Sequence, residues 1–212
     1  VMLEKSSLAE NLLNSMSQLL RNFKGGLGIS VVIVGMLLAA STGIVGATVV
    51  TMGLISLPTM LKQGYSPSLA SGTICATGTL GQIIPPSIAL VLLGDIIANS
   101  YQQAQLAQGI FAPKTISVGD LFLGAVVPGM LLIIMYIVYL MLVARFEPRS
   151  IPIVTEQKIK NSFFQLLKPL MPPVILIFSV LGSILFGLAT PTEAAGIGAI
   201  GAILLTYNAN ML

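Results

Sequence analysis

Apolar residues dominate this chain in long runs that carry no charged side chain. These runs cover 25–61, 63–94, 96–113, 121–144, 169–192 and 194–212. About 18 to 20 consecutive apolar residues are enough for a helix to cross a bilayer. Several of the runs reach that length, so the pattern predicts an all-α integral membrane protein.

The first 24 residues follow a different pattern. Between 8 and 23, apolar side chains recur at every third or fourth position with polar side chains between them, which is typical of an amphipathic helix. This segment is too polar to cross the membrane. Its apolar face therefore lies at the membrane interface or packs on neighbouring helices, and the sequence leaves both alternatives open.

The segment 25–62 has an unusual length for a membrane protein. One straight helix of this length would measure about 55 Å against a hydrocarbon core of about 30 Å, whereas two full crossings need roughly 40 residues and a turn. Small and hydroxylated residues from Ser41 to Thr48 interrupt its middle, and basic residues flank both ends. The positive-inside rule places both ends in the cytoplasm. We therefore predict a re-entrant helical hairpin, with two short crossings as the alternative.

The segment 63–98 is also longer than one crossing and is also interrupted. Between Gly78 and Ser87 it holds two glycines and the pair Pro85 and Pro86. Glycine lowers helix stability by about 1 kcal/mol, and proline removes a backbone donor. We predict a transmembrane helix broken at the prolines, with a simple kink as the alternative. Irregular backbone inside a membrane must be satisfied by protein or a water-filled cavity, so such breaks are typical of binding sites.

The rest of the chain predicts simpler elements. We expect a polar external loop at 99–120, a transmembrane helix at 121–144 and a basic cytoplasmic loop at 145–168. The helices of 169–212 contain closely spaced glycines that allow near approach to neighbours, and we expect them to form part of a truncated scaffold.

The amino-acid composition excludes several classes of function. Charged residues make up 8% of the chain, hydrophobic residues 55%, and the mean hydropathy is +0.97. Soluble globular proteins contain about 25% charged residues, so a soluble enzyme is excluded. Without histidine and with a single cysteine, the chain offers no imidazole or thiolate metal site, and we expect no cofactor. Its net charge of +3 is not gathered into a basic stripe, so nucleic acid is not an expected partner.

The two interruptions suit a monovalent cation. No acidic residue lies between Glu10 and Asp95, so backbone and hydroxyl oxygens would have to hold any cation there. Such ligands favour Na⁺ over Ca²⁺ or Mg²⁺, which recruit carboxylates. Helices that begin after Gly43 and after Pro86 would direct N–H groups to the same place, which suits a carboxylate. The predicted Na⁺ ligands are oxygens of Ser41, Thr42, Gly43, Gly46, Gly78, Thr79 and Gly81.

Six stretches resemble a known family over nearly all of 1–207. They are 38–48, 52–53, 64–65, 78–87, 124–129 and 191–195, and the most specific is the broken-helix motif that ends in Ile84-Pro85-Pro86-Ser87. They are similar to the large membrane subunit of the tripartite ATP-independent periplasmic (TRAP) transporters.

The resemblance implies an elevator-type secondary transporter of the bacterial inner membrane, driven by a sodium gradient. Such a transporter imports an organic acid that a periplasmic substrate-binding protein delivers, and it works with a small membrane subunit within the lipid bilayer. The resemblance places one half of the substrate and sodium site at 41–48 and 78–87. The predicted substrate-binding residues are Ser41, Thr42, Thr48, Thr79, Gln82 and Ser87.

The chain departs from the family in length. The family's large subunit is about twice as long and has a second, inverted hairpin and broken helix, which nothing after Glu193 resembles. We therefore expect a fragment from the N-terminal half that holds half of a site. Two other functions stay open: a non-transporting membrane scaffold or assembly subunit, and a sodium-coupled carboxylate carrier that needs no binding protein.

Overall fold

The computed structural model describes residues 8–147, 149–151, 166 and 168–208, and within them the chain is helical with no strand. The predicted all-α class is therefore confirmed for this part of the chain. The elements are α2 (Leu8–Leu19), α3 (Gly26–Thr42), α4 (Val45–Lys62), α5 (Pro67–Thr79), α6 (Ile88–Ala107), α7 (Val118–Phe146), α9 (Met171–Leu185) and α10 (Pro191–Asn208), with the short 3-10 turns η1 (Leu80–Gln82) and η2 (Lys168–Leu170).

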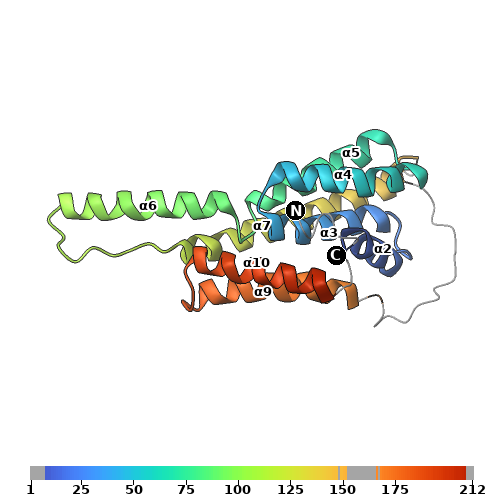
Figure 1. The fold of residues 1–212 in the computed structure, drawn as a ribbon. Coiled ribbons are helices and arrows are strands. Elements are labelled where there is room, and N and C mark those ends of the chain that lie inside the picture. Colours follow the sequence, from blue (N-terminus) through green and yellow to red (C-terminus); the bar gives the residue numbers. More distant parts are fainter. Residues whose placement is uncertain (1–7, 148, 152–165, 167, 209–212) are drawn as a thin grey trace.

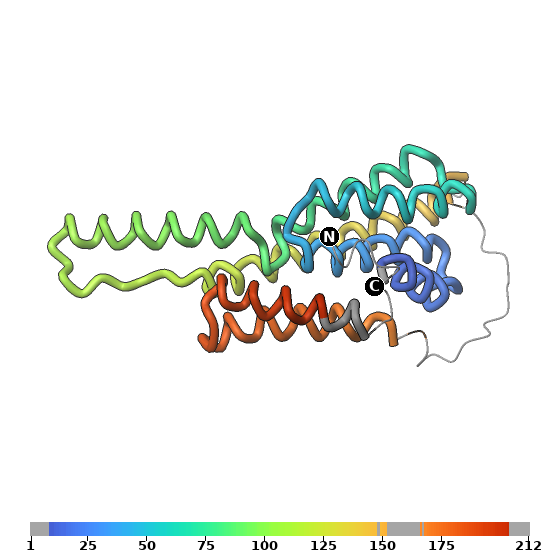
Figure 2. The backbone as a smooth tube through the Cα atoms, in the orientation of Figure 1, coloured from blue at the N-terminus to red at the C-terminus, as the bar shows by residue number. Residues whose placement is uncertain are grey.

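The helices form a bundle from which one helix projects (Figure 1). Helix α3 packs on α2, α4, α5 and α7, and α10 packs on α9. Figure 2 shows α6 extending away from the bundle, with the chain returning beside it to the start of α7. The start of α6 and the tip of the α3–α4 pair both lie where this arm leaves the bundle.

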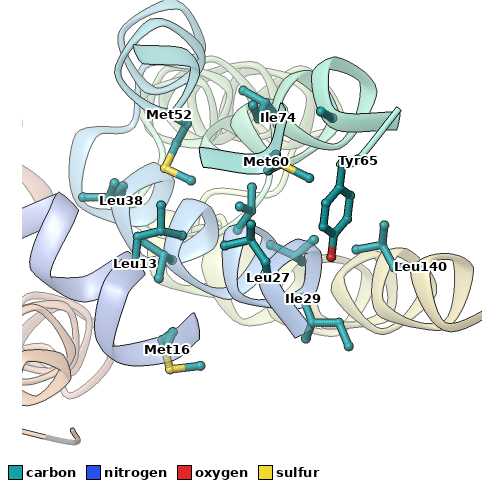
Figure 3. Close-up of a cluster of buried hydrophobic side chains, with 14 of the residues drawn as sticks. Leu13, Met16, Leu27, Ile29, Leu38, Met52, Met60, Tyr65, Ile74 and Leu140 are labelled. Atoms are coloured by element: carbon teal, nitrogen blue, oxygen red, sulfur yellow. The ribbon is translucent and has the colours of Figure 1, made fainter. Parts of the chain in front are cut away.

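Helix α3 is the centre of the core. Its residues are apolar on every side, and Val31, Val32 and Val34 are completely buried. A helix with no polar face is stable only when other elements surround it. Side chains from α2, α4, α5 and α7 supply that cover, among them Leu13, Met52 and Leu140 (Figure 3).

Helix α2 resolves one of the open alternatives. Its apolar residues Leu12 and Leu13 are buried and belong to the core around α3, whereas Glu10, Asn11 and Asn14 are exposed. In the structure, its apolar face therefore packs on neighbouring helices.

Three of the described helical segments are long and apolar enough to cross a membrane: Val45–Lys62, Val118–Phe146 and Lys168–Leu185. Large apolar side chains on their outer faces are exposed, including Leu54, Val127 and Phe178. A water-soluble protein would bury such side chains, whereas a lipid-facing surface requires them. These helices support the predicted membrane protein.

The structure corrects the prediction of an external loop at 99–120. Helix α6 continues to Ala107, because glutamine, alanine and leucine are good helix formers and neither glycine nor proline occurs between Gly94 and Gly109. Gly109, at φ +81°, then ends the helix as its N–H bonds to the Leu106 carbonyl and that of Ile110 to the Gln105 carbonyl. Only 108–117 is a connection between helices.

Helix α7 covers the predicted helix 121–144 and extends it at both ends. It begins earlier because Ser117 and Asp120 form a capping box, in which each side chain accepts a hydrogen bond from the other's backbone N–H. Most of the predicted basic loop at 145–168 lies outside the described residues. The two interruptions predicted at 41–48 and 78–87 are both present, as a turn between α3 and α4 and as an irregular segment between η1 and α6.

Candidate functional site

The turn between α3 and α4 is built on one glycine. Helix α3 ends where Gly43 takes a left-handed conformation (φ +62°) and donates its N–H to the Ala39 carbonyl at 2.9 Å. Residues with a Cβ adopt this conformation at a cost, so glycine allows the sharp turn. Ile44 is extended and α4 begins at Val45, so two residues reverse the chain.

Hydroxyl groups form hydrogen bonds that connect the end of α3 with the start of α4 at this hairpin tip. The Oγ1 atoms of Thr42 and Thr48 lie 2.7 Å apart, and the Thr48 hydroxyl donates to the Ile44 carbonyl at 3.1 Å. The Thr42 hydroxyl also lies 3.4 Å from the Ala39 carbonyl, so either threonine can be the donor of the bond between them. The Ser41 hydroxyl donates to the Leu38 carbonyl at 2.8 Å. Thr48 is almost completely buried, whereas Ser41 and Thr42 are partly accessible.

The break between α5 and α6 presents a second turn. After η1 the chain is irregular to Ser87, and the Pro85–Pro86 peptide is cis. The Ser87 hydroxyl accepts the Leu90 N–H at 3.4 Å and so caps the start of α6. The same hydroxyl donates to the Gln82 carbonyl at 2.8 Å, which fixes the path of the break.

The hairpin tip and the break pack directly against each other. The Gln82 amide Nε2 donates to the Gly43 carbonyl at 3.0 Å, across 39 residues of sequence. A Cβ at Gly81 would lie 3.0 Å from the Ala39 carbonyl oxygen, so glycine permits η1 to approach α3 this closely. Gly43 in turn lies against Pro86 and Ile88. Two segments remote in sequence therefore form one structural unit.

A cavity of about 440 Å³ lies beside this unit. The hairpin tip and the start of α6 form one side, and Phe122 with helices α9 and α10 forms the other. Its lining residues are Ala40, Ser41, Thr42, Gly43, Ile44, Ala47, Pro86, Ser87, Ile88, Val91, Phe122, Leu176, Ile177, Val180, Ile184, Pro191, Ala195, Gly198, Ala199 and Ala202. The volume falls within the range of small-molecule sites.

The cavity is apolar except at the hairpin tip and the start of α6. Ser41, Thr42 and Ser87 supply its polar side chains, and none of the described residues that line it is charged. No cluster of three His, Cys, Asp or Glu side chains occurs among the described residues. A cation bound here would therefore depend on carbonyl and hydroxyl oxygens, and an anion on hydroxyl and backbone N–H groups.

The structure brings part of the predicted site to the cavity. Ser41, Thr42, Gly43 and Ser87 line it, together with Pro86 from the predicted break. Thr48 and Gln82 do not line it, but their side chains hold the hairpin tip through the hydrogen bonds described above. Spacing along the sequence could not distinguish the residues that line the cavity from those that hold the hairpin tip.

The other predicted ligands lie away from the cavity. Gly46 is exposed, and Gly78 and Gly81 pack against Val49 and Ala39. Thr79 is exposed, and its hydroxyl donates to the Ala76 carbonyl at 2.7 Å.

The sequence did not predict that α9 and α10 form one wall of the cavity. Its apolar residues resemble any membrane helix, and the glycine spacing of α10 indicated close packing alone. Glu193 stabilises the start of α10. Its carboxylate accepts hydrogen bonds from the Thr190 N–H at 2.8 Å and from the Thr190 hydroxyl at 2.9 Å.

Comparison with known proteins gives a consistent result over nearly the whole chain. Residues 1–210 match the family described as the tripartite ATP-independent periplasmic transporter, DctM component. The C4-dicarboxylate TRAP transporter large permease protein DctM of Vibrio cholerae is 37% identical over 180 residues, which cover 84% of this chain and 35% of that protein.

Two further relatives are similar. The DctM permease of Pseudomonas aeruginosa is 32% identical over 193 residues, 91% of this chain and 40% of that protein. The ectoine TRAP transporter large permease protein TeaC of Halomonas elongata is 31% identical over 204 residues, 94% of this chain and 42% of that protein. The chain thus spans less than half the length of each of these relatives.

Proposed function

This chain belongs to the tripartite ATP-independent periplasmic transporter family, DctM component, and we propose that it supplies half of the substrate and sodium site of a sodium-coupled importer of organic acids. It is a multi-pass protein of the bacterial inner membrane and not an enzyme. The relatives' names include C4-dicarboxylate, ectoine and sialic acid. The choice among such substrates belongs to the complete permease.

The cavity at the hairpin tip is the observation that carries this proposal. Its polar groups are uncharged oxygens at Ser41, Thr42 and Gly43 in the hairpin tip and at Ser87 at the start of α6. Carbonyl and hydroxyl oxygens without a carboxylate suit Na⁺. Helices α4 and α6 both begin at this place, and their free N–H groups favour a carboxylate. The proposed ligand set is narrower than the sequence predicted, because Gly46, Gly78, Thr79 and Gly81 lie elsewhere.

Replacing Thr42 by valine tests the sodium site. The change exchanges one oxygen at the cavity for a methyl group of similar size, and we expect it to raise the sodium concentration for half-maximal uptake about three- to tenfold. The measurement is uptake by the complete permease in proteoliposomes as the sodium concentration is varied.

Two matched variants separate this role from packing. Thr48→Val removes the same Thr42–Thr48 hydrogen bond but leaves the Thr42 hydroxyl at the cavity, and Thr79→Val removes a hydroxyl outside it. Both should have smaller effects on sodium dependence. Equal effects of all three variants, or none with Thr42→Val, would refute the assignment.

The re-entrant hairpin remains part of the proposal. Helix α3 has 17 residues and so a length of about 26 Å, which is short of a full crossing of about 30 Å. Helix α4 is long enough to cross, but it begins at the same tip and is joined to α3 by two residues, so it should share the depth of α3. The tip is also held by other parts of the protein, because Gly43 is buried against Pro86 and Ile88 of the break. We expect the hairpin and the broken helix to move together past α9 and α10, as an elevator-type mechanism requires.

Cysteine accessibility tests this topology. On a Cys75→Ser background, a cysteine at position 62 should react with a membrane-impermeant thiol reagent from the cytoplasmic side, and a cysteine at 44 should react slowly from both sides. Two full crossings instead predict fast reaction at position 44 from the periplasmic side. That result would rule out the re-entrant hairpin.

The proposed partners are a small membrane subunit and a periplasmic substrate-binding protein. The connection 108–117 at the end of the projecting α6 is a candidate surface for the binding protein. Gln105 holds it in place, since its amide donates to the Lys114 carbonyl and accepts the Lys114 N–H, both at 3.0 Å. This leaves Phe111 91% exposed and Ile110 beside it 43% exposed. A held loop with exposed apolar residues fits the core of a weak interface.

Membership in a family described as tripartite and periplasmic favours a transporter that works with a binding protein over a sodium-coupled carboxylate carrier that needs none. A non-transporting scaffold is the other alternative. It predicts no uptake from a permease that contains this chain.

A further inference from the structure

Gln82 contacts both the hairpin tip and the residue that caps the start of α6, but it does not line the cavity. Its side-chain Nε2 donates to the Gly43 carbonyl at the hairpin tip at 3.0 Å. Its backbone carbonyl accepts from the Ser87 hydroxyl at the start of α6 at 2.8 Å. Gly43 and Ser87 both line the cavity, and Gln82 does not.

These two hydrogen bonds constrain two residues that line the cavity, Gly43 and Ser87. A backbone carbonyl has two acceptor lone pairs, so the Gly43 carbonyl keeps one available when Gln82 occupies the other. The Ser87 hydroxyl gives its proton to Gln82 and accepts the Leu90 N–H. Its direction is therefore set by Gln82 on one side and by helix α6 on the other.

We infer that Gln82 is a positioning residue that couples the hairpin tip to the start of α6, so that binding of a ligand at the hairpin tip changes the affinity for a ligand at the start of α6. The inference rests on the function proposed above. It assigns Gln82 no contact with the ion or the substrate. Displacement of Gly43 by a bound ion would move Gln82 and with it the hydroxyl of Ser87, because Gln82 bonds to both.

The packing between the hairpin tip and the break should persist when the side-chain amide of Gln82 is removed. Gly81 packs closely on Ala39, and Gly43 lies against Pro86 and Ile88, and neither contact involves the Gln82 side chain. Gln82→Met keeps the length and approximate volume of the side chain but removes the donor. We therefore expect this variant to fold, and Gln82→Leu serves as a second variant without an amide.

The first measurement is independent of transport. In a Cys75→Ser background, Ser41→Cys reports the mobility of the hairpin tip through its rate of reaction with a thiol reagent. Adding Gln82→Met should increase this rate about three- to tenfold, as expected for the loss of one hydrogen bond. Gln103→Met is the matched control, because Gln103 is exposed on α6 away from the cavity, and it should leave the rate unchanged.

The second measurement is the linkage between sodium and substrate in the complete permease with Ser41 intact. In the unmodified protein, substrate should lower the dissociation constant for sodium, because the two sites are coupled, and sodium should lower that for the substrate by the same factor, because linkage of binding free energies is reciprocal. Gln82→Met should reduce this mutual effect about three- to tenfold, whereas a merely structural residue would lower the amount of folded permease and leave the linkage intact.

The two measurements separate failure of this inference from failure of the proposed function. An unchanged labelling rate with unchanged linkage overturns the role of Gln82 and leaves the sodium site standing. Faster labelling in a permease whose unmodified form shows no sodium-dependent uptake supports the contact between Gln82 and the tip but removes the proposed function, and with it the coupling.

Discussion

Alanine in place of Gly78 is expected to lower the free energy of unfolding by about 1 to 3 kcal/mol, because the added Cβ overpacks the contact between α5 and α4. It would overlap the side chain of Val49 and lie 3.2 Å from its backbone nitrogen and 3.3 Å from its Cα. A side chain can rotate away, but the backbone of α4 can yield only by moving away from α5. These two helices share an extensive contact, and Val49 directly follows the hairpin tip, so the displacement would reach the tip.

Gly72 on the same helix provides the matched control. A Cβ at this position would meet no atom within 4 Å. Gly72→Ala should therefore raise the free energy of unfolding by about 0.5 to 1 kcal/mol, because glycine is a poor helix residue. Both variants can be compared by thermal unfolding of the detergent-solubilised permease followed by circular dichroism. Shifts of the same sign and size in both would contradict the close packing at Gly78.

Loss of the apolar pair at the end of the arm is expected to have the largest effect on coupling to the binding protein. Replacing both Ile110 and Phe111 by serine should raise the concentration of binding protein for half-maximal uptake by more than about tenfold, because buried aromatic and aliphatic anchors carry most of the energy of an interface. Both side chains are exposed in the structure, so the change should leave folding and membrane insertion intact.

Phe146→Ser is the control for this experiment. Phe146 is 77% exposed at the opposite end of α7, where the predicted topology places the cytoplasm. The Phe146→Ser variant loses an exposed aromatic side chain without a change in the arm. Uptake by this variant should depend on the concentration of binding protein as it does in the unmodified permease. A normal concentration dependence in the double variant would show that 108–117 is a solvated connection between helices.

The sequence by itself determined the class of the protein and the two interruptions at 41–48 and 78–87. Long uncharged apolar runs have one stable environment, so an all-α membrane protein followed directly from them. The turn at Gly43 and the break before Ser87 were also predictable, because glycine and proline act on the backbone within a few residues of their own position. The end of α6 was misplaced because polarity was taken as a sign of a loop, although glutamine and alanine favour a helix.

Only the tertiary structure decided which residues of the two interruptions reach the cavity. Ser41 and Thr42 line it, whereas Thr48 and Thr79, of the same chemical type and in the same two segments, do not. The face that a side chain presents depends on the rotation of its helix, and packing against distant helices sets that rotation. The bond from Gln82 to Gly43 spans 39 residues, and the opposite wall comes from α9 and α10. Such contacts arise from the simultaneous packing of several helices, which local spacing along the chain does not specify.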